Sequence, residues 1–229
     1  MNILLVAATQ FEIRPLLDAY EWEANAASNL FSSKNDSLRL DILITGVGQV
    51  ATTYHLTKHL EHHSYDLIIN AGICGSFKKE IELGTVVNIV SESFGDLGAE
   101  YGDQFLDIFE MKLADENEFP FQNKKLLNHF PLQLHSVFNL PKATSVTLNK
   151  VLGKEDSIEK IIGRFNADVA NMEGAAFFYT ALRTGTPFLE LRSVSNFIEP
   201  RNKENWKVDL AVSNLNSVLM NLLDELETV

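Results

Sequence analysis

The 229-residue chain has a single cysteine, Cys74, which excludes an internal disulfide and a metal site built from several thiolates. It also lacks an excess of positive charge. Its 19 Lys and Arg stand against 31 Asp and Glu, for a formal net charge of −12. Such a chain, without a basic cluster, repels a phosphate backbone, so we expect no nucleic-acid partner. One free thiol is typical of a reducing compartment, and we expect a cytoplasmic protein.

Long apolar runs are absent as well. None approaches the roughly 20 residues that span a bilayer, and the start Met1–Val6 has no basic segment, so we expect neither a membrane partner nor a signal peptide. The chain is 45% hydrophobic and 22% charged, which is ordinary for a globular protein with a substantial core. Because no repeat, linker or composition boundary divides it, we predict one domain over residues 1–229.

Short apolar runs, which predict buried strands, alternate with segments of helical periodicity. Strands are expected at 3–8, 31–38, 39–45, 66–70, 85–93, 145–148 and 188–193. Helices are expected at 12–20, 50–62, 157–165 and 174–184, and along the apolar stripe from Leu215 to Leu226. The alternation predicts an α/β fold of three layers, with helices on both faces of a central mixed sheet. Residues 95–141 show no clear pattern; a long irregular segment of this kind often forms a lid or a subunit contact.

The segment Gly46–Ala51 follows a predicted strand and opens a helix, so it matches the G-x-G-x-x-A dinucleotide fingerprint. The acidic residue 20 positions on, Asp66, starts a strand, whereas the ribose-binding acid of that fingerprint ends the second strand. The fingerprint also belongs on the first strand. A tight turn that lets backbone approach a ligand is therefore favoured over NAD binding.

His55, His59 and His62 share one face of the predicted helix 50–62. Zinc can use such spacing, but a zinc site also needs further ligands and a closed pocket. Glu61 lies off this face, and there is no H-E-x-x-H motif. A solvated helix face is the favoured interpretation, and we predict no metal.

Polar residues stand where several predicted strands end. They are Glu12, Asn70–Gly75, Asn171–Glu173 and Arg192–Asn196. Each alone has an ordinary structural explanation: a surface acid, a strand-to-loop turn, a helix-capping acid and a strand end in solvent. In an α/β sheet, however, ligands bind beyond the carboxyl ends of the strands. If the segments converge there, two carboxylates and an amide surround one cavity. Cys74, without a neighbouring His or Lys, is interpreted as filler.

Taken in order, five elements of the sequence resemble the purine nucleoside phosphorylase and nucleosidase superfamily over nearly the whole chain. They are Glu12, Thr45–Gly48, Asn70–Gly72, Met172–Ala176 and Arg192–Asn196. Within it, the tail Ser195–Arg201 followed by Trp206 is similar to the futalosine hydrolase family. The methylthioadenosine/S-adenosylhomocysteine nucleosidases ordinarily have Asp where this chain has Asn196. The resemblance implies a phosphorylase/hydrolase-like fold and hydrolysis of the N-glycosidic bond of a purine nucleoside.

The resemblance also implies roles for individual residues. Glu12 would orient and deprotonate the attacking water. Glu173 would hold the ribose hydroxyls and stabilise an oxocarbenium-like transition state, with Arg192 beside both acids. The amide of Asn196 donates hydrogen bonds but cannot deliver a proton, which favours a 6-oxopurine such as hypoxanthine over adenine. The remaining substrate-binding residues would be Val47, Ile73, Cys74, Val151, Met172, Ser195 and Phe197.

For the substituent beyond ribose C5′, Tyr101 and Phe105 are candidates for an apolar wall and Arg201 for a cation that binds a carboxylate. Family members commonly oligomerise near the pocket mouth, so we expect a homodimer or a higher homo-oligomer. The mechanism requires no metal or organic cofactor.

Three other functions remain open. A methylthioadenosine, S-adenosylhomocysteine or aminofutalosine nucleosidase would keep the fold and the chemistry and release adenine. A phosphorylase needs a phosphate cradle, and a single Arg14 beside Glu12 makes a weak one. A non-catalytic nucleoside-binding protein would not need both carboxylates.

Overall fold

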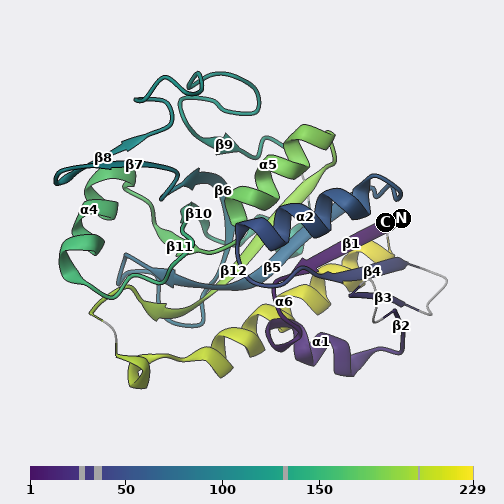
Figure 1. The fold of residues 1–229 in the computed structure, drawn as a ribbon. Helices are drawn as coiled ribbons and strands as arrows, with labels where there is room; N and C mark the ends of the chain where they lie inside the picture. The colour runs from purple at the N-terminus through teal and green to yellow at the C-terminus, as the bar shows by residue number, and fades with distance from the viewer. Residues whose placement is uncertain (26–28, 34–37, 131–133, 201, 229) are drawn as a thin grey trace.

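The computed structural model describes residues 1–25, 29–33, 38–130, 134–200 and 202–228. Its centre is a mixed sheet with the strand order β11-β10-β6-β12-β5-β1-β4-β3-β2, in which β9 also pairs with β6 (Figure 1). The strands of this sheet are β1 (Asn2–Ala7), β2 (Trp22–Asn25), β3 (Leu30–Ser33), β4 (Arg39–Ile44), β5 (Leu67–Ser76), β6 (Val86–Phe94), β9 (Leu126–Leu127), β10 (Lys142–Thr147), β11 (Val169–Asn171) and β12 (Phe188–Phe197). A separate hairpin pairs β7 (Gly98–Tyr101) with β8 (Gln104–Asp107).

Helices cover both faces of the sheet. They are α1 (Arg14–Ala19), α2 (Gln49–Leu60), α3 (His135–Phe138), α4 (Glu155–Phe165), α5 (Gly174–Thr184) and α6 (Val208–Glu227), with the 3-10 turns η1 (Gln10–Ile13) and η2 (Lys203–Asn205). In Figure 1, α2 and α5 lie on one face of the sheet, and α1 and α6 lie on the other. The predicted α/β fold with a central mixed sheet between helices is therefore confirmed.

The apolar run of β1 shows how the sequence builds these layers. Successive side chains of a strand point to opposite faces of a sheet. Leu5 therefore packs in the core cluster that contains Leu215 of α6, while Leu4 packs in the cluster that contains Phe177 of α5. Because both faces of β1 are covered, the run is continuously apolar instead of alternating.

The sheet closes on itself around β5. This strand pairs in parallel with β12 and, at its far end, antiparallel with β11. The pairings of β12 with β6, β6 with β10, and β10 with β11 complete a ring of strands. The parallel strands β1, β4, β5 and β12 run in one direction, so their carboxyl ends meet at one edge of the sheet.

The ring corrects two predicted boundaries. The segment Asn70–Gly75 was expected to leave its strand, but β5 continues to Ser76; likewise, β12 continues through Arg192–Asn196 to Phe197. The reason is that the backbone there has partners: Gly75 pairs with Ala170 of β11 and with Asn196 of β12. Buried backbone groups that find partners in this way need not turn out to solvent.

The segment without a clear sequence pattern, 95–141, contains β7, β8, β9 and α3. Arg164 of α4 anchors it: one Nη donates to the Phe105 carbonyl oxygen at 2.9 Å and the other to Asp107 Oδ2 at 2.8 Å. Its role as a lid or a subunit contact stays a prediction. The strand predicted at 31–38 is seen as β3, and its residues 34–37 lie outside the described part of the chain.

Across the residues that the structure describes, no helix combines the length and the apolar character that crossing a bilayer requires.

Candidate active site

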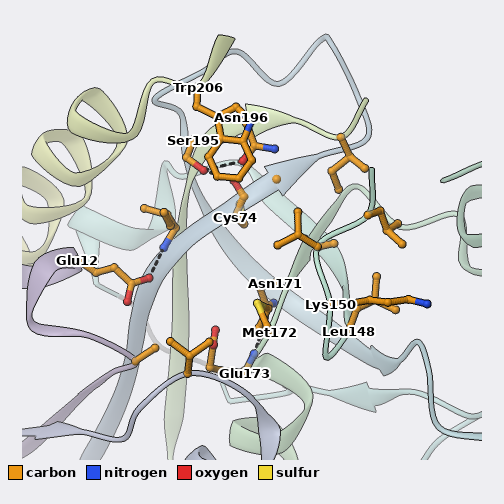
Figure 2. A pocket seen from close by; sticks show the side chains of 18 of the residues that line it. Glu12, Cys74, Leu148, Lys150, Asn171, Met172, Glu173, Ser195, Asn196 and Trp206 are labelled. Atoms are coloured by element: carbon orange, nitrogen blue, oxygen red, sulfur yellow. Dashed lines mark hydrogen bonds between the residues drawn. The ribbon is translucent and has the colours of Figure 1, made fainter. Parts of the chain in front are cut away.

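A cavity of about 270 Å³ opens at the carboxyl edge of the parallel strands. Figure 2 shows Glu12 and Glu173 on one side of it and Ser195, Asn196 and Trp206 on another, with Cys74 between them. The predicted site residues that line this cavity are Glu12, Val47, Ile73, Cys74, Val151, Met172, Glu173, Ser195 and Asn196. Segments spread over nearly the whole chain therefore meet at one place.

Glu12 enters the cavity from η1, directly after β1. Its Oε2 accepts hydrogen bonds from the backbone N (3.1 Å) and the Oγ1 (2.9 Å) of Thr9, the residue that caps η1. Its Oε1 accepts from the backbone N of Ile73 at 3.1 Å. The carboxyl is only 7% exposed. Burial raises its pKa above the ordinary value, and Glu173 adds to the shift, whereas Arg192 opposes it. A carboxylate with a raised pKa is suited to accept a proton near neutral pH.

The position of Glu12 is held from behind by α6. Asn216, buried in that helix, donates to the backbone carbonyl oxygen of Glu12 at 2.9 Å and accepts from the backbone N of Leu16 at 3.1 Å. It also donates to the carbonyl oxygen of Val212 at 2.7 Å. These bonds fix η1 and α1 against the core. Asn216 was not among the predicted residues, although a lone Asn on the otherwise apolar buried stripe of this helix was a visible signal.

Glu173 stands at the N-terminus of α5, where its backbone N donates to Asn171 Oδ1 at 2.8 Å. Its Oε1 accepts from the backbone N of Gly48 at 3.1 Å. Gly48 has φ +93°, a left-handed conformation that favours glycine, and α2 begins at the next residue. The predicted tight turn thus aims its backbone and the positive end of α2 at a carboxylate. Because the N–H of Gly48 donates to Glu173, it does not point at a dinucleotide phosphate, as the NAD-binding fingerprint would require.

Arg192 lies behind the two carboxylates and is 1% exposed. Its Nε donates to Glu190 Oε1 at 2.7 Å, and its Nη1 lies 3.5 Å from Glu173 Oε2. Burial opposes the charge of the guanidinium, but Glu190, Glu173 and Glu12 together raise its pKa above the ordinary value. The side chain passes over Gly72, where a Cβ would collide with Nη1. Arg192 therefore stays charged and faces both cavity carboxylates.

The other end of the cavity carries the amide of Asn196. Its Nδ2 donates to the carbonyl oxygen of Phe197 at 3.0 Å, and its Oδ1 accepts from Ser195 Oγ at 2.9 Å. A rotation of the amide by 180° would set its oxygen against that carbonyl oxygen. The carbonyl oxygen of Phe197, which can only accept, consequently fixes which atom of the amide is the donor. The second hydrogen of Nδ2 remains for a hydrogen-bond acceptor in the cavity.

Four of the predicted site residues that the structure describes do not line this cavity: Arg192, which lies behind it, Phe197, which ends β12, and Tyr101 and Phe105. Arg201 lies outside the described residues. Tyr101 and Phe105 belong to the β7–β8 hairpin. Tyr101 is 75% exposed, and the ring of Phe105 lies 5.2 Å from the guanidinium of Arg164. Within one chain the hairpin pairs with itself and with α4, so these two rings do not form a wall of the cavity.

Several lining residues were not predicted. They are Ala8, Thr9, Phe11, Gly75, Leu148, Lys150, Leu152, Ala170, Asn171, Ile198 and Trp206. Most follow a strand end or adjoin a predicted residue, so proximity along the chain was the available signal. Leu148–Leu152 follows β10, whose alignment with the other strands depends on the closed ring.

The histidine face of α2 is used differently from a metal site. His59 Nε2 lies 2.6 Å from the hydroxyl of Tyr65, which donates to the buried Asp41 at 2.7 Å. Burial, and then electrostatic repulsion from the neighbouring His63, lower the pKa of His59 to about 4. The ring is therefore neutral at physiological pH. Among the described residues, no three His, Cys, Asp or Glu side chains are grouped to hold a metal ion.

Comparison with known proteins agrees with this geometry. A sequence model of the Phosphorylase superfamily matches residues 2–229. The chain is 29% identical to the futalosine hydrolase of Streptomyces coelicolor, over 82% of this chain and 80% of the relative. It is 28% identical to the futalosine hydrolase of Thermus thermophilus, over 80% of each. The structure superposes with a TM-score of 0.81 on the MTA/SAH nucleosidase of Streptococcus pneumoniae in complex with 8-aminoadenine, at 20% identity, covering 98% of this chain and all of the other.

The fold and the cavity define a site with two buried carboxylates at the carboxyl edge of a mixed sheet. The chain belongs to the Phosphorylase superfamily.

Proposed function

We propose that this protein is a purine nucleoside hydrolase that cleaves the N-glycosidic bond of futalosine, releasing hypoxanthine and dehypoxanthine futalosine in menaquinone biosynthesis. The names of the relatives from Streptomyces coelicolor and Thermus thermophilus support the substrate. The observation that carries the proposal is the oriented amide of Asn196, which offers a donor to the base end of the cavity while two carboxylates occupy the ribose end.

In the proposed reaction, Glu12 accepts a proton from the attacking water. Ile73 N and Thr9 hold its two oxygens, so the carboxylate is oriented before the water arrives. The water oxygen bonds to ribose C1′ as the bond from C1′ to the purine nitrogen breaks. The bonding pair leaves with the base, and the water proton passes to Glu12.

Glu173 has the complementary task at the sugar. Its Oε1 is held by Gly48 N and its Oε2 faces Arg192 Nη1. Remaining lone pairs can accept hydrogen bonds from the ribose 2′- and 3′-hydroxyls. The negative charge lies where positive charge develops on the ribose, and a preorganised charge in a buried site stabilises that transition state strongly.

Asn196 determines the base. Its Nδ2 can donate to N7 or O6 of a 6-oxopurine and stabilise the negative charge of the departing base; the base then takes its proton from solvent. Because N7 accepts in every purine, the discrimination comes from position 6, where the amino group of adenine would place a donor against this donor. A buried polar mismatch of that kind typically costs about 1–3 kcal/mol, or roughly a factor of 5 to 150 in rate.

A nucleosidase that releases adenine is the second candidate, because relatives named 5'-methylthioadenosine/S-adenosylhomocysteine nucleosidase and aminodeoxyfutalosine nucleosidase are each 23% identical to this chain. A phosphorylase is less well supported. Arg14 pairs with Asp18 at 3.0 Å, and both side chains are exposed, so Arg14 is not poised to bind phosphate beside Glu12.

The proposal includes a homodimer or a higher homo-oligomer in the cytoplasm. Phe11 and Val47, which line the cavity mouth, are 55% and 56% exposed, and Val50 and Tyr54 on the adjoining α2 are 82% and 57% exposed. Apolar side chains grouped in this way are typical of a surface that another chain covers. Light scattering at several protein concentrations tests the assembly, and a monomer at all of them would contradict it.

The decisive experiment follows base release from futalosine, inosine and methylthioadenosine, each with and without phosphate, by chromatography. We expect phosphate-independent release of hypoxanthine from futalosine, and its loss in Glu12→Gln and Glu173→Gln variants that remain folded. Asn196→Asp should shift the preference towards 6-aminopurines. Adenine release by the parent would support the second candidate, and phosphate-dependent cleavage of inosine would indicate a phosphorylase. No base release under any condition would favour a binding protein.

A further inference from the structure

Two further carboxyl groups lie behind the cavity, in the ring of strands. Glu92 of β6 and Glu190 of β12 are both 0% exposed. They approach each other over Gly174, the first residue of α5. A Cβ on Gly174 would lie 2.7 Å from Glu190 Oε1 and 2.7 Å from the carboxyl carbon of Glu92. Two carboxylates in this position are costly unless each has a partner or a proton.

The described partners of Glu92 are neutral. Its Oε1 accepts from Asn171 Nδ2 at 2.6 Å, and its Oε2 lies 2.8 Å from Thr147 Oγ1, a hydroxyl that can donate to an ionised carboxyl or accept from a protonated one. Asn171 also receives, on its Oδ1, the backbone N–H groups of Glu173 and Gly174 at 2.8 and 2.6 Å. Asn171 thus links Glu92 by hydrogen bonds to the backbone of the cavity carboxylate Glu173.

Glu190 is connected to the same carboxylate by a second route. Its Oε1 accepts from Arg192 Nε at 2.7 Å, and Arg192 Nη1 faces Glu173 Oε2 at 3.5 Å. Its Oε2 is buried and has no hydrogen-bond partner among the described residues. The Glu190 carboxyl therefore fixes the direction in which the guanidinium of Arg192 points.

The charges of this region do not balance if every acid is ionised. Glu12, Glu173, Glu190 and Glu92 are all buried, and Arg192 is a cation that faces the first three. Four carboxylates beside one guanidinium would leave three uncompensated negative charges, and of the four acids Glu92 and Glu190 do not line the cavity and are fully shielded from its water. Buried acids in such surroundings retain protons. The proposed reaction requires Glu12 to be free to accept a proton. The retained proton is therefore assigned to one of the two carboxyls behind the cavity.

We propose that Glu92 and Glu190 form a pair of electrostatically interacting carboxyls, in which the ionised Glu190 is the positioning residue for Arg192 and Glu92 holds a proton at neutral pH. With that proton in place, Glu190 carries one negative charge towards Arg192 Nε, and the other side of the guanidinium faces Glu173 and Glu12. The catalytic consequence rests on the proposed hydrolase function, whereas the protonation itself does not.

The surroundings of Glu92 agree with this assignment. Burial, and then the charge of Glu190, raise the pKa of Glu92 to about 8, while hydrogen bonds from its polar neighbours lower it. The pKa of Glu190 is raised by burial and lowered by Arg192. The polar, titratable and charged groups around Glu92 come from every strand of the ring: Cys74 of β5, Ser145 and Thr147 of β10, Asn171 of β11, and Glu190 and Arg192 of β12, with Glu173 at the start of α5.

The test compares Glu92→Gln with Glu190→Gln. Glutamine imitates a protonated carboxyl, so Glu92→Gln should move the alkaline limb of the kcat profile upwards by about one pH unit or more. Glu190→Gln should lower kcat at least about tenfold with little change in KM, because Arg192 loses its charged anchor. Asp18→Asn removes the carboxylate of an exposed Arg pair and serves as the matched control, with no change expected.

Two further measurements do not need a substrate. In the infrared difference spectrum of parent minus Glu92→Gln at neutral pH, we expect the carbonyl band of a protonated carboxyl. Denaturation by urea should show a smaller loss of stability between pH about 5 and 8 in Glu92→Gln. The sign follows because the folded parent keeps a proton that the unfolded chain releases in this range, so parental stability falls as the pH rises.

The proposal is overturned if the infrared band is absent, if Glu92→Gln keeps the parental pH dependence, or if a folded Glu92→Gln loses as much kcat as Glu190→Gln. It is also overturned if a folded Glu190→Gln keeps the parental kcat and pH profile. Should no nucleoside be cleaved, the hydrolase function fails, but the infrared and denaturation results still decide whether Glu92 holds the proton.

Discussion

Replacement of Gly72 by alanine tests the packing of the candidate site most directly. The backbone of Gly72 lies in β5 without a positive φ, so alanine itself imposes no backbone strain. Any effect of the substitution must therefore come from steric contact of the new Cβ with its neighbours. The new Cβ would lie 3.3 Å from Arg192 Cζ and 2.8 Å from Glu12 Oε1, and still closer to Arg192 Nη1. Since ordinary contacts require about 3.5–4.0 Å, the guanidinium has to move by about 1 Å.

Arg192 has little freedom to make that movement, because its Nε is bonded to Glu190 in a fully buried position. A displacement of about 1 Å in a catalytic group costs roughly 100-fold in rate, and overpacking a core costs about 1–3 kcal/mol of stability. We therefore expect Gly72→Ala to lose about 100-fold in kcat for base release. Its free energy of unfolding in urea should fall by about 1–3 kcal/mol, so the protein stays folded if its parental stability is typical.

Gly163→Ala is the matched control. Gly163 is exposed in α4, and a Cβ there meets nothing within 4 Å. Alanine in a helix should raise stability by about 0.5–1 kcal/mol and leave kcat unchanged. A Gly72→Ala protein with the parental kcat would refute the inference that Arg192 and Glu12 must keep their positions across this glycine.

Two other predictions follow from buried contacts. Asn216→Leu removes the partners of Glu12 O and Leu16 N; each unsatisfied group costs about 1–3 kcal/mol, so urea denaturation should show a marked loss of stability and kcat should fall, whereas the exposed Ser217→Ala should change neither. Parental stability in Asn216→Leu would contradict this anchoring. Burial raises the pKa of Cys74 to about 12, so iodoacetamide at mildly alkaline pH should label the denatured chain but not the native one, as mass spectrometry can show; rapid labelling of the folded protein would mean that this thiol is accessible.

The sequence by itself was sufficient for the layered architecture. Continuous apolar runs such as that of β1 belong to strands covered on both faces, and the stripe from Leu215 to Leu226 belongs to one face of a helix. These patterns are local and have fixed periods, so they can be recognised without knowledge of the partners. The polar residues at strand ends were recognisable for a related reason: parallel strands bring their carboxyl ends to one edge.

Other features depended on how distant segments pair. The sequence marks Asn70–Gly75 and Arg192–Asn196 as strand ends, because glycines and polar residues there interrupt the apolar runs. The antiparallel pairing of β11 with β5 keeps both segments in the sheet instead. Likewise, no local pattern shows whether Tyr101 and Phe105 reach the cavity, since the self-paired β7–β8 hairpin decides where they lie.

The sequence thus determined which residues are apolar, which are chemically capable, and in what order they occur along the sheet. Only the tertiary structure decided that Glu92 and Glu190, each inside a strand of the central sheet, meet Asn171 and Arg192 behind the cavity. The physical reason is that periodicity specifies the face on which a side chain lies, whereas its neighbours are set by strand order and register. Those depend on burial and hydrogen bonding summed over the whole chain.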